Sequence, residues 1–250
     1  MKDGFIRVAA ATPDIHVADP QYNSEQIIEL MEQGSTRGVK VMAFPELCLT
    51  AYTCSDLFLQ ESLLREAKKE LKRILQASKS KDMILFVGMP WMHKGKLYNV
   101  AAVLNRGRIL GIVPKKHLPN YSEFYELRHF NPGMEKVEMT DWEGVQVPMG
   151  MNLLFACRTM PELVLAAELC EDVWVPCPPS ISHALAGATV IANCSASDET
   201  TGKDQYRYNL ICGQSARLVC GYIYANAGEG ESSQDLVFGG QNLIAENGTM

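Results

Sequence analysis

The stretch LVLAAELCEDVWVPCPP, residues 163–179, sets the expectations for the whole chain. It begins as a short apolar run, which is typical of a buried strand. It then places four polar residues within five positions: Glu168, Cys170, Glu171 and Asp172. The prolines that follow predict that regular structure stops there. Carboxylates at the end of a buried strand cost free energy unless something compensates, and an active site is one such compensation. Packing is the commoner role of a buried cysteine, so this stretch alone assigns no activity.

Two distant segments repeat the pattern of an apolar run that ends in one charged residue beside a proline. VMAFPELCLTAY, residues 41–52, places Glu46 after a proline, and ILGIVPKKHLPNYSEFYELRHF, residues 109–130, does the same for Lys115. Lys116 is expected on the surface, because neighbouring residues on a strand point to opposite faces. Three predicted strand ends therefore carry a carboxylate, an ammonium group and a thiol.

The composition is that of an ordinary globular chain. Its 250 residues are 47% hydrophobic and 21% charged, with a formal net charge of −6. This length suits one large domain or two small ones. Basic residues do not cluster, which argues against a nucleic-acid partner, and no apolar run approaches the ~20 residues that cross a bilayer. The start of the chain enters a strand pattern directly, so no signal peptide and no membrane partner are predicted.

The eight cysteines show neither a zinc-binding spacing nor the pattern of a small secreted disulfide framework. Several of them lie inside apolar runs, which favours reduced thiols and a cytoplasmic protein. The five histidines show no HxxxH spacing, so no metal site is predicted.

Apolar periodicity predicts helices over residues 24–36, 56–78, 182–188 and 204–219. Apolar runs predict strands over 5–11, 39–44, 83–89, 99–105, 108–113, 152–157, 163–169, 188–194 and 220–225. Glycine turns at 106–107 and 239–240 predict hairpins, the second one between 236–238 and 243–245. Because hairpins interrupt the alternation of helices and strands, a doubly wound parallel sheet fits poorly. Helices outside a mixed sheet, an α/β fold, fit better.

The last residues, AENG at 245–248, are typical of a strand that runs into an Asn-Gly turn. A return strand should follow, but the sequence stops at Met250. We therefore expect residues 1–250 to be one domain of a longer chain that is truncated at its C-terminal end.

The three motifs together resemble the nitrilase superfamily, whose amidases use a Glu, a Lys and a Cys at strand ends. The motifs match residue by residue at Glu46, Lys115 and Cys170. The resemblance implies an α/β fold with four layers, an α-β-β-α sandwich, that pairs with a second copy as a homo-oligomer. Glu126 matches a second glutamate of many members, which implies a supporting role in orienting Lys115.

Five longer motifs, spread over almost the whole chain, resemble the glutaminase domain of glutamine-dependent NAD synthetases. They are FPELCLTAY, VPKKHLPNYSEFYE, LCEDVWVP, NCSASDETTGKDQYR and GEGESSQDLVFGGQNLIAENG. The resemblance implies hydrolysis of glutamine. The ammonia would pass to a synthetase domain, absent from this sequence, that amidates nicotinic acid adenine dinucleotide with ATP. No cofactor is implied for this domain, and ATP with Mg²⁺ belongs to the synthetase domain. No glycine loop opens a helix in the way that holds a phosphate, so this chain alone is not expected to make NAD.

Free glutamine carries an ammonium and a carboxylate, so its binding site needs charges of both signs. Motif matching implies four substrate-binding residues: Tyr121, Glu171, Ser197 and Lys203. Glu171 would meet the ammonium group of glutamine and Lys203 its carboxylate.

The chemistry expected of the motif residues is attack by the Cys170 thiol on a carboxamide, which needs a base. Glu46 is the candidate base, because burial strengthens the basicity of a carboxylate. Lys115 cannot be a base while it is charged, and it suits the developing oxyanion instead. Three alternatives stay open: a Cys–His pair with His117, a stand-alone amidase for another small amide, and a non-catalytic assembly module.

Overall fold

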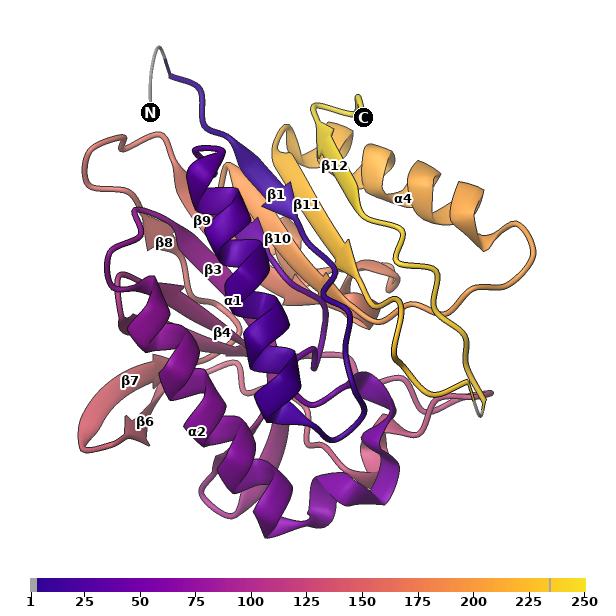
Figure 1. Cartoon of the computed structure of the whole chain (residues 1–250). Coiled ribbons are helices and arrows are strands. Elements are labelled where there is room, and N and C mark those ends of the chain that lie inside the picture. Colours follow the sequence, from indigo (N-terminus) through magenta and orange to yellow (C-terminus); the bar gives the residue numbers. More distant parts are fainter. Residues whose placement is uncertain (1–3, 234) are drawn as a thin grey trace.

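Four α-helices and two β-sheets build the part of the chain described by this computed structural model, residues 4–233 and 235–250 (Figure 1). The helices are α1 (Pro20–Thr36), α2 (Glu61–Ser78), α3 (Pro179–Leu185) and α4 (Lys203–Leu218). Short 3₁₀ helices are η1 (Tyr52–Leu59), η2 (Glu126–Arg128) and η3 (Cys170–Val173).

The larger sheet has seven strands in the order β1-β2-β3-β4-β5-β7-β6. Their bounds are β1 (Val8–Ala10), β2 (Val41–Ala43), β3 (Ile84–His93), β4 (Lys96–Asn105), β5 (Arg108–Pro114), β6 (Glu138–Trp142) and β7 (Val145–Met149). β1, β2 and β3 are parallel, whereas β3, β4 and β5 are antiparallel. The strands β2 and β5 therefore run in the same direction, and their C-terminal ends lie at the same edge.

The smaller sheet has five strands in the order β12-β11-β10-β9-β8. They are β8 (Phe155–Ala156), β9 (Val164–Leu169), β10 (Val190–Ser195), β11 (Gly221–Asn226) and β12 (Leu243–Glu246). The central strands β9, β10 and β11 are parallel, and the two edge strands are antiparallel to their neighbours. Both sheets are mixed, and the predicted hairpin at 106–107 joins β4 to β5 in the larger one.

Three apolar clusters separate four layers. The first packs α1 and α2 on the large sheet and includes Ile27, Leu71 and Val87. The second lies between the sheets and includes Phe86 and Leu165. The third packs the small sheet against the layer that contains α4. Figure 1 shows α1 and α2 beside each other and α4 on the opposite side of the sheets. The expected α-β-β-α sandwich is therefore confirmed.

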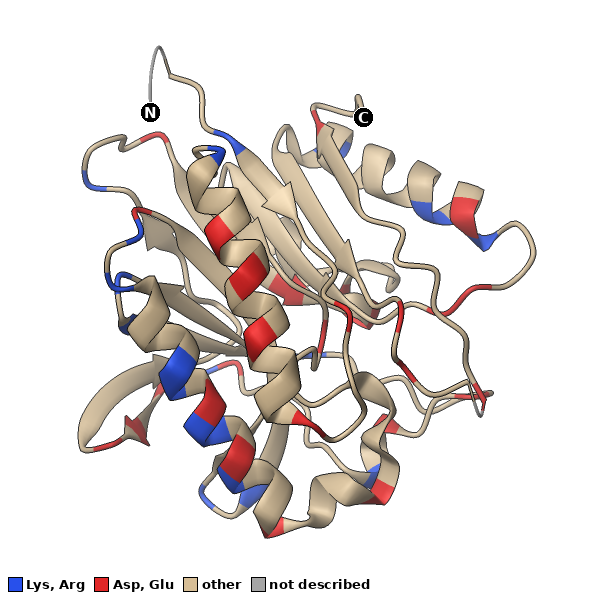
Figure 2. Cartoon of the chain, viewed as in Figure 1, with Lys and Arg blue, Asp and Glu red and all other residues tan. Residues whose placement is uncertain are grey.

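The helix α2 shows why these residues form a surface helix. Leu71 and Ile74 are fully buried on one face, and each such side chain contributes about 1.5–3 kcal/mol when it leaves water. On the other face, Lys72 bonds to Glu143 over 2.9 Å. Charges of both signs alternate along the outer face of α2 in Figure 2, as in an ordinary solvated face.

The first two helices, α1 and α2, begin at residues other than those predicted. α1 begins at Pro20 rather than Ser24, because the Asp19 side chain accepts a hydrogen bond from the Tyr22 N–H (3.1 Å) and caps the helix. The predicted helix over 56–78 is wrong in its first turn. Residues 56–59 belong to the 3₁₀ helix η1, and the extended backbone of Gln60 (φ −87°, ψ 119°) separates it from α2, which begins at Glu61.

The remaining differences concern turns and edges. Pro179 begins α3 instead of ending regular structure, because proline fits the first turn of a helix. Residues 236–238 form no strand, and β12 pairs with β11 instead. The hairpin of β6 and β7 was not predicted, since β6 is an edge strand and six of the ten residues in the two strands are polar or exposed. The predicted turn at Asn247 and Gly248 is present.

Candidate active site

The structure brings the three motif residues to one place. Glu46 follows β2, Lys115 follows β5, and Cys170 follows β9 as the first residue of η3. Glu46 connects the two sheets, because its N–H donates to the Ser195 carbonyl (3.3 Å) and its Oε2 accepts from the Ala196 N–H (3.1 Å). The C-terminal strand ends of both sheets therefore meet at Glu46.

The centre of the site is a buried cluster of one ammonium and two carboxylates. Lys115 Nζ donates to Glu46 Oε1 and to Glu126 Oε1, each over 2.6 Å. Lys115 and Glu46 are 0% exposed and Glu126 is 4% exposed. Asn99 Nδ2 also donates to Glu46 Oε1 (2.6 Å). Buried charges are tolerated when they are paired and hydrogen-bonded in this way.

The cluster shifts the pKa values of Lys115 and Glu126. Burial alone would lower the pKa of Lys115, but the Glu126 and Glu46 carboxylates hold this pKa well above its usual value. Burial raises the pKa of Glu126 to about 7, although Lys115 opposes the change. Lys115 is therefore an ammonium group, which excludes it as a base.

Cys170 lies at a strained turn next to this cluster. Its φ of 39° is in a region that residues other than glycine rarely adopt, and such strain is common at active sites. Burial raises the pKa of the Cys170 thiol, Glu46 raises it further, and Lys115 opposes both. The thiol is therefore protonated at rest and needs a base before it can attack.

Asp172 joins the nucleophile turn to the Lys115 segment. Its carboxylate accepts hydrogen bonds from the backbone N–H groups of Leu169 (3.0 Å), Lys116 (3.3 Å) and His117 (2.8 Å). Lys116 is only partly buried, as expected, whereas Lys115 is enclosed. His117 meets the site through its backbone, and its buried Nε2 has no hydrogen-bond partner among the described residues. The structure thus gives no support to a Cys–His pair.

Replacing Asp172 with alanine should lower the free energy of unfolding by about 3 kcal/mol, because three backbone N–H groups lose their acceptor. Urea unfolding measures the loss. The matched control is Asp141→Ala on β6, an exposed residue that accepts one long hydrogen bond from the Gly144 N–H (3.4 Å), and it should change stability by no more than about 0.5 kcal/mol. Equal losses in the two variants would contradict the structural role of Asp172.

Three of the four predicted substrate residues lie together beside the thiol. The Tyr121 hydroxyl donates to the Glu171 carboxylate, with 3.1 Å to each oxygen. Lys203 Nζ lies over the rings of Trp174 and Phe124, 5.5 Å and 5.9 Å from their centroids. Tyr121 packs edge-on against the same Phe124 ring. Lys203 already has a carboxylate partner, Asp198, which sequence reasoning did not identify.

The fourth predicted residue, Ser197, is buried rather than part of a surface loop. Its Oγ accepts from Arg207 (3.2 Å), and its N–H donates to Asn226 Oδ1 (2.8 Å). Arg207 is 0% exposed, also donates to the Asp198 carbonyl (2.9 Å), and holds this loop in shape. Arg207 ends one of the quoted motifs, but nothing in a single sequence marks an arginine as buried.

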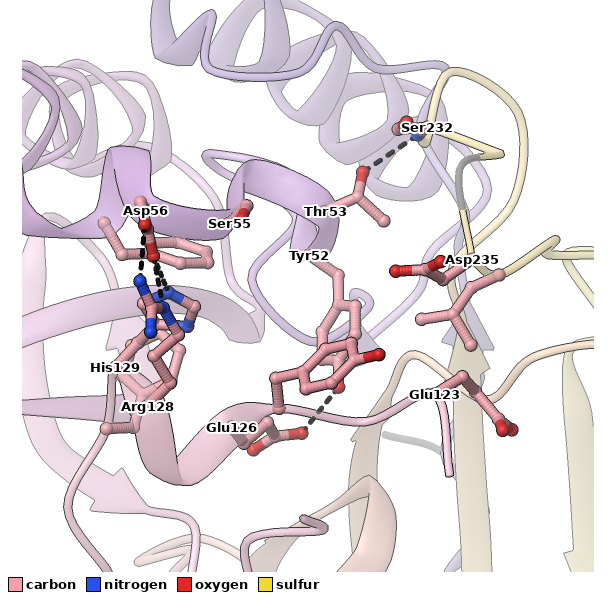
Figure 3. Close-up of a pocket in the computed structure, with 14 residues that line it drawn as sticks. Tyr52, Thr53, Ser55, Asp56, Glu123, Glu126, Arg128, His129, Ser232 and Asp235 are labelled. Atoms are coloured by element: carbon pink, nitrogen blue, oxygen red, sulfur yellow. Dashed lines mark hydrogen bonds and ion pairs between the residues drawn. The ribbon is translucent and has the colours of Figure 1, made fainter. Parts of the chain in front are cut away.

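A cavity of about 430 Å³ opens beside the cluster (Figure 3). Glu126 lines it and bonds to the Tyr52 hydroxyl (2.8 Å). Asp56 lies on its wall and pairs with Arg128 and His129. The other lining residues are Thr53, Ser55, Phe58, Glu123, Tyr125, Phe130, Ser232, Asp235 and Leu236. The cavity therefore touches the buried cluster at Glu126, the residue that also bonds to Lys115.

Residues 4–233 and 235–250 contain neither a metal-binding group nor a membrane-spanning helix. In that part of the chain no three His, Cys, Asp or Glu side chains are grouped as a metal ion requires. None of its helices combines the length and the apolar character that crossing a bilayer demands.

Comparison with known proteins identifies the family. The carbon-nitrogen hydrolase family matches residues 7–247. The chain is 42% identical over 247 residues to the glutamine-dependent NAD(+) synthetase of Mycobacterium tuberculosis. The aligned region covers 99% of this chain and 36% of that protein. The solved glutamine-dependent NAD(+) synthetase from Cytophaga hutchinsonii superimposes with a TM-score of 0.87 at 29% identity, over 98% of this chain and 39% of that one.

A Nesterenkonia amidase from the nitrilase superfamily has the same fold, with a TM-score of 0.75 at 19% identity, over 97% of this chain and 83% of that one. This likeness shows the fold, and the carbon-nitrogen hydrolase match over residues 7–247 confirms the family resemblance that the motifs predict. The chain spans little more than a third of the length of the synthetases that it matches. Its match to the family covers nearly every residue, and the chain therefore belongs to the carbon-nitrogen hydrolases.

Proposed function

We propose that this chain hydrolyses the side-chain amide of glutamine through a cysteine thioester, as the glutaminase domain of a glutamine-dependent NAD synthetase. The observation that carries the proposal is the buried bonding of Lys115 to both Glu46 and Glu126, next to Cys170. Similarity to two such synthetases supports glutamine as the substrate. Residues 1–250 form this one domain. The ammonia serves a synthetase domain outside this chain, which amidates nicotinic acid adenine dinucleotide with ATP and Mg²⁺, and hydrolysis itself uses no cofactor.

The first half-reaction forms the thioester. Glu46 takes the proton of the Cys170 thiol, and the sulfur attacks the amide carbon of glutamine. Lys115 stabilises the negative charge that develops on the amide oxygen. The C–N bond then breaks, and the proton on Glu46 goes to the leaving nitrogen, which departs as ammonia.

The second half-reaction frees the acid. Glu46 takes a proton from water, and the hydroxide oxygen attacks the thioester carbon. The C–S bond breaks, the Cys170 sulfur recovers its proton, and glutamate leaves. Glu126 orients Lys115 throughout, since both oxygens of this carboxylate lie near donors, Lys115 and Asn99. One glutamine and one water thus give one glutamate and one ammonia.

Substrate recognition uses the two charged ends of glutamine. Glu171 binds the ammonium group and is held by Tyr121. Lys203 binds the carboxylate from its place over Trp174, and Ser197 shapes the same loop. Since Asp198 partly neutralises Lys203 in the free chain, the glutamine carboxylate competes with Asp198 for this ammonium group.

Lys203→Met should raise the KM for glutamine about tenfold or more, because a charge-assisted hydrogen bond to the carboxylate is lost. The kcat should stay within about threefold, since Lys203 touches no reacting atom in the proposed mechanism. Steady-state ammonia release measures both constants. The control is Lys72→Met on the outer face of α2. A fall in kcat with unchanged KM would assign Lys203 a different role.

Ammonia release from a panel of amides tests the proposed function itself. Glutamine should be hydrolysed far faster than asparagine, D-glutamine or butyramide. Preference for an uncharged amide would indicate a stand-alone amidase instead. No turnover of any amide, combined with no labelling of Cys170 by an electrophile, would indicate a non-catalytic assembly module.

We also propose that the chain forms a homo-oligomer, which pairs through the outer layer that contains α3 and α4. We propose the cytoplasm as its compartment. Exposed apolar residues on that layer support the pairing, since Leu185 at the end of α3 is 85% exposed and Val219 after α4 is 75% exposed. The free state of all eight cysteines is consistent with a reducing compartment. Light scattering measures the oligomeric state directly.

A further inference from the structure

Glu168 is a buried carboxylate that the proposed chemistry does not use. It lies on β9, two residues before Cys170, and is 1% exposed. One carboxylate oxygen accepts a close hydrogen bond from the Tyr222 hydroxyl. The other accepts from the backbone N–H of Ser180 (2.8 Å). A charge held so far from water needs an explanation beyond packing.

Hydrogen bonds continue from Glu168 to the nucleophile. The Tyr222 oxygen accepts from Asn193 Nδ2 (3.1 Å), and Asn193 Oδ1 accepts from the backbone N–H of Cys170 (3.1 Å). Tyr222 and Asn193 are both 0% exposed. This series of hydrogen bonds crosses the three parallel strands of the small sheet, from Glu168 on β9 to Tyr222 on β11 and back through Asn193 on β10. It links the side chain of Glu168 to the main chain of Cys170.

The two ends of this chain of hydrogen bonds fix its direction. A carboxylate only accepts hydrogen bonds, so the Tyr222 hydroxyl donates to Glu168 and its oxygen is free to accept. A backbone N–H only donates, so Cys170 requires the oxygen of the Asn193 amide and not its nitrogen. One orientation of the Asn193 amide satisfies both ends, and it is the one observed.

We propose that Glu168 is a positioning residue for the nucleophile: acting through Tyr222, it holds the oxygen of Asn193 against the Cys170 N–H. The proposal rests on the proposed function, in which Cys170 attacks the amide. The turn at Cys170 needs such support, because its φ of 39° is disfavoured for a residue with a side chain. The same bond occupies the Cys170 N–H, which leaves Lys115 and other backbone groups to meet the oxyanion.

Removing the Glu168 carboxylate should reverse the direction of these hydrogen bonds. In Glu168→Leu the Tyr222 hydroxyl loses its acceptor. Of its two hydrogen-bond partners, Asn193 remains to accept the hydrogen bond of this hydroxyl. The Asn193 amide then turns, and its nitrogen faces the Cys170 N–H. We expect kcat for glutamine to fall about tenfold or more, with KM within about threefold, because the attacking atom is displaced while the substrate site is not.

A double variant separates this role from simple stabilisation. Glu168→Leu with Tyr222→Phe removes the hydroxyl that turns the amide, so Asn193 can again offer its oxygen to Cys170. We expect the double variant to recover kcat severalfold over Glu168→Leu alone, although it has lost more hydrogen bonds. The matched control is Glu70→Leu, which removes a buried carboxylate that accepts from Ser24 (2.6 Å) between α1 and α2. Its kcat should stay within about twofold of the original.

The rate at which iodoacetamide labels Cys170 gives a second readout that does not need glutamine. It should fall in Glu168→Leu and recover in the double variant, with circular dichroism confirming that each protein is folded. If the unaltered chain labels at Cys170 but hydrolyses no glutamine, the proposed function fails and labelling alone decides the role of Glu168. Folded Glu168→Leu with unchanged kcat and labelling, or a double variant slower than Glu168→Leu, would overturn the proposal.

Discussion

Replacing Cys170 with alanine is expected to abolish ammonia release from glutamine, with a loss of about 10⁴-fold or more. The thiol supplies the sulfur of the thioester, and no other group can form that bond from the same place. Alanine is close to cysteine in size, so the buried turn at the start of η3 should keep its shape. Ammonia release measures the loss of turnover, and a glutamine-like electrophile followed by mass spectrometry measures the loss of covalent trapping.

Two other cysteines provide the controls for this variant. Cys194 is fully buried between the sheets and Cys177 is exposed. Burial raises the pKa of Cys194 well above its usual value, so this thiol should react slowly despite lying one strand away from Cys170. Replacing either with alanine should leave turnover nearly unchanged. If the electrophile labels one of these two cysteines and the Cys170→Ala variant stays active, Cys170 is not the nucleophile.

The positions of Glu46, Lys115 and Cys170 at strand ends could be predicted because each follows an apolar run, and the family resemblance implied that the three act in one site. Strands of that length are buried, and their ends are where polar side chains can meet without leaving the layered core. The family resemblance then supplied the pairing of the two sheets, which no local pattern contains. The apolar runs and the resemblance together predict the four layers that the structure shows.

The partners of those residues could not be predicted, because they come from distant parts of the chain. Asp172 accepts from the backbone of Lys116 and His117, which carries no sequence signal at all. Asn193 meets Cys170 only because β9 and β10 are paired in one register. Arg207 is fully buried although arginine is usually exposed, since four polar groups around it accept its hydrogen bonds. Backbone partners and strand register are properties of the fold rather than of residue type.

Glu46→Gln is expected to slow the reaction by about 10²- to 10⁴-fold, because it keeps the shape of the side chain and removes its basicity. The side-chain oxygen of the substituted residue 46 can still accept from Lys115 or from the Ala196 N–H, so the segment after β2 should stay in place. The change also removes one of the two carboxylates that hold the pKa of Lys115 high against the effect of burial. A lower pKa of Lys115 makes its positive charge less secure, so the stabilisation of the oxyanion also weakens.

Glu126→Gln is the matched control, since it removes the other carboxylate bonded to Lys115 at the same distance. If Glu46 is the base and Glu126 only orients Lys115, the loss of kcat should be clearly larger for Glu46→Gln. Equal losses would mean that the charge near Lys115 matters and that neither carboxylate moves the proton alone.

Single-turnover measurements separate the two steps that Glu46 serves. The same carboxylate takes the thiol proton in the first half-reaction and the water proton in the second, so both thioester formation and thioester hydrolysis should slow in Glu46→Gln. A variant that formed the thioester normally and only hydrolysed it slowly would place another base at Cys170. A change confined to KM would remove Glu46 from the chemistry altogether, because a lost base lowers kcat rather than the affinity for substrate.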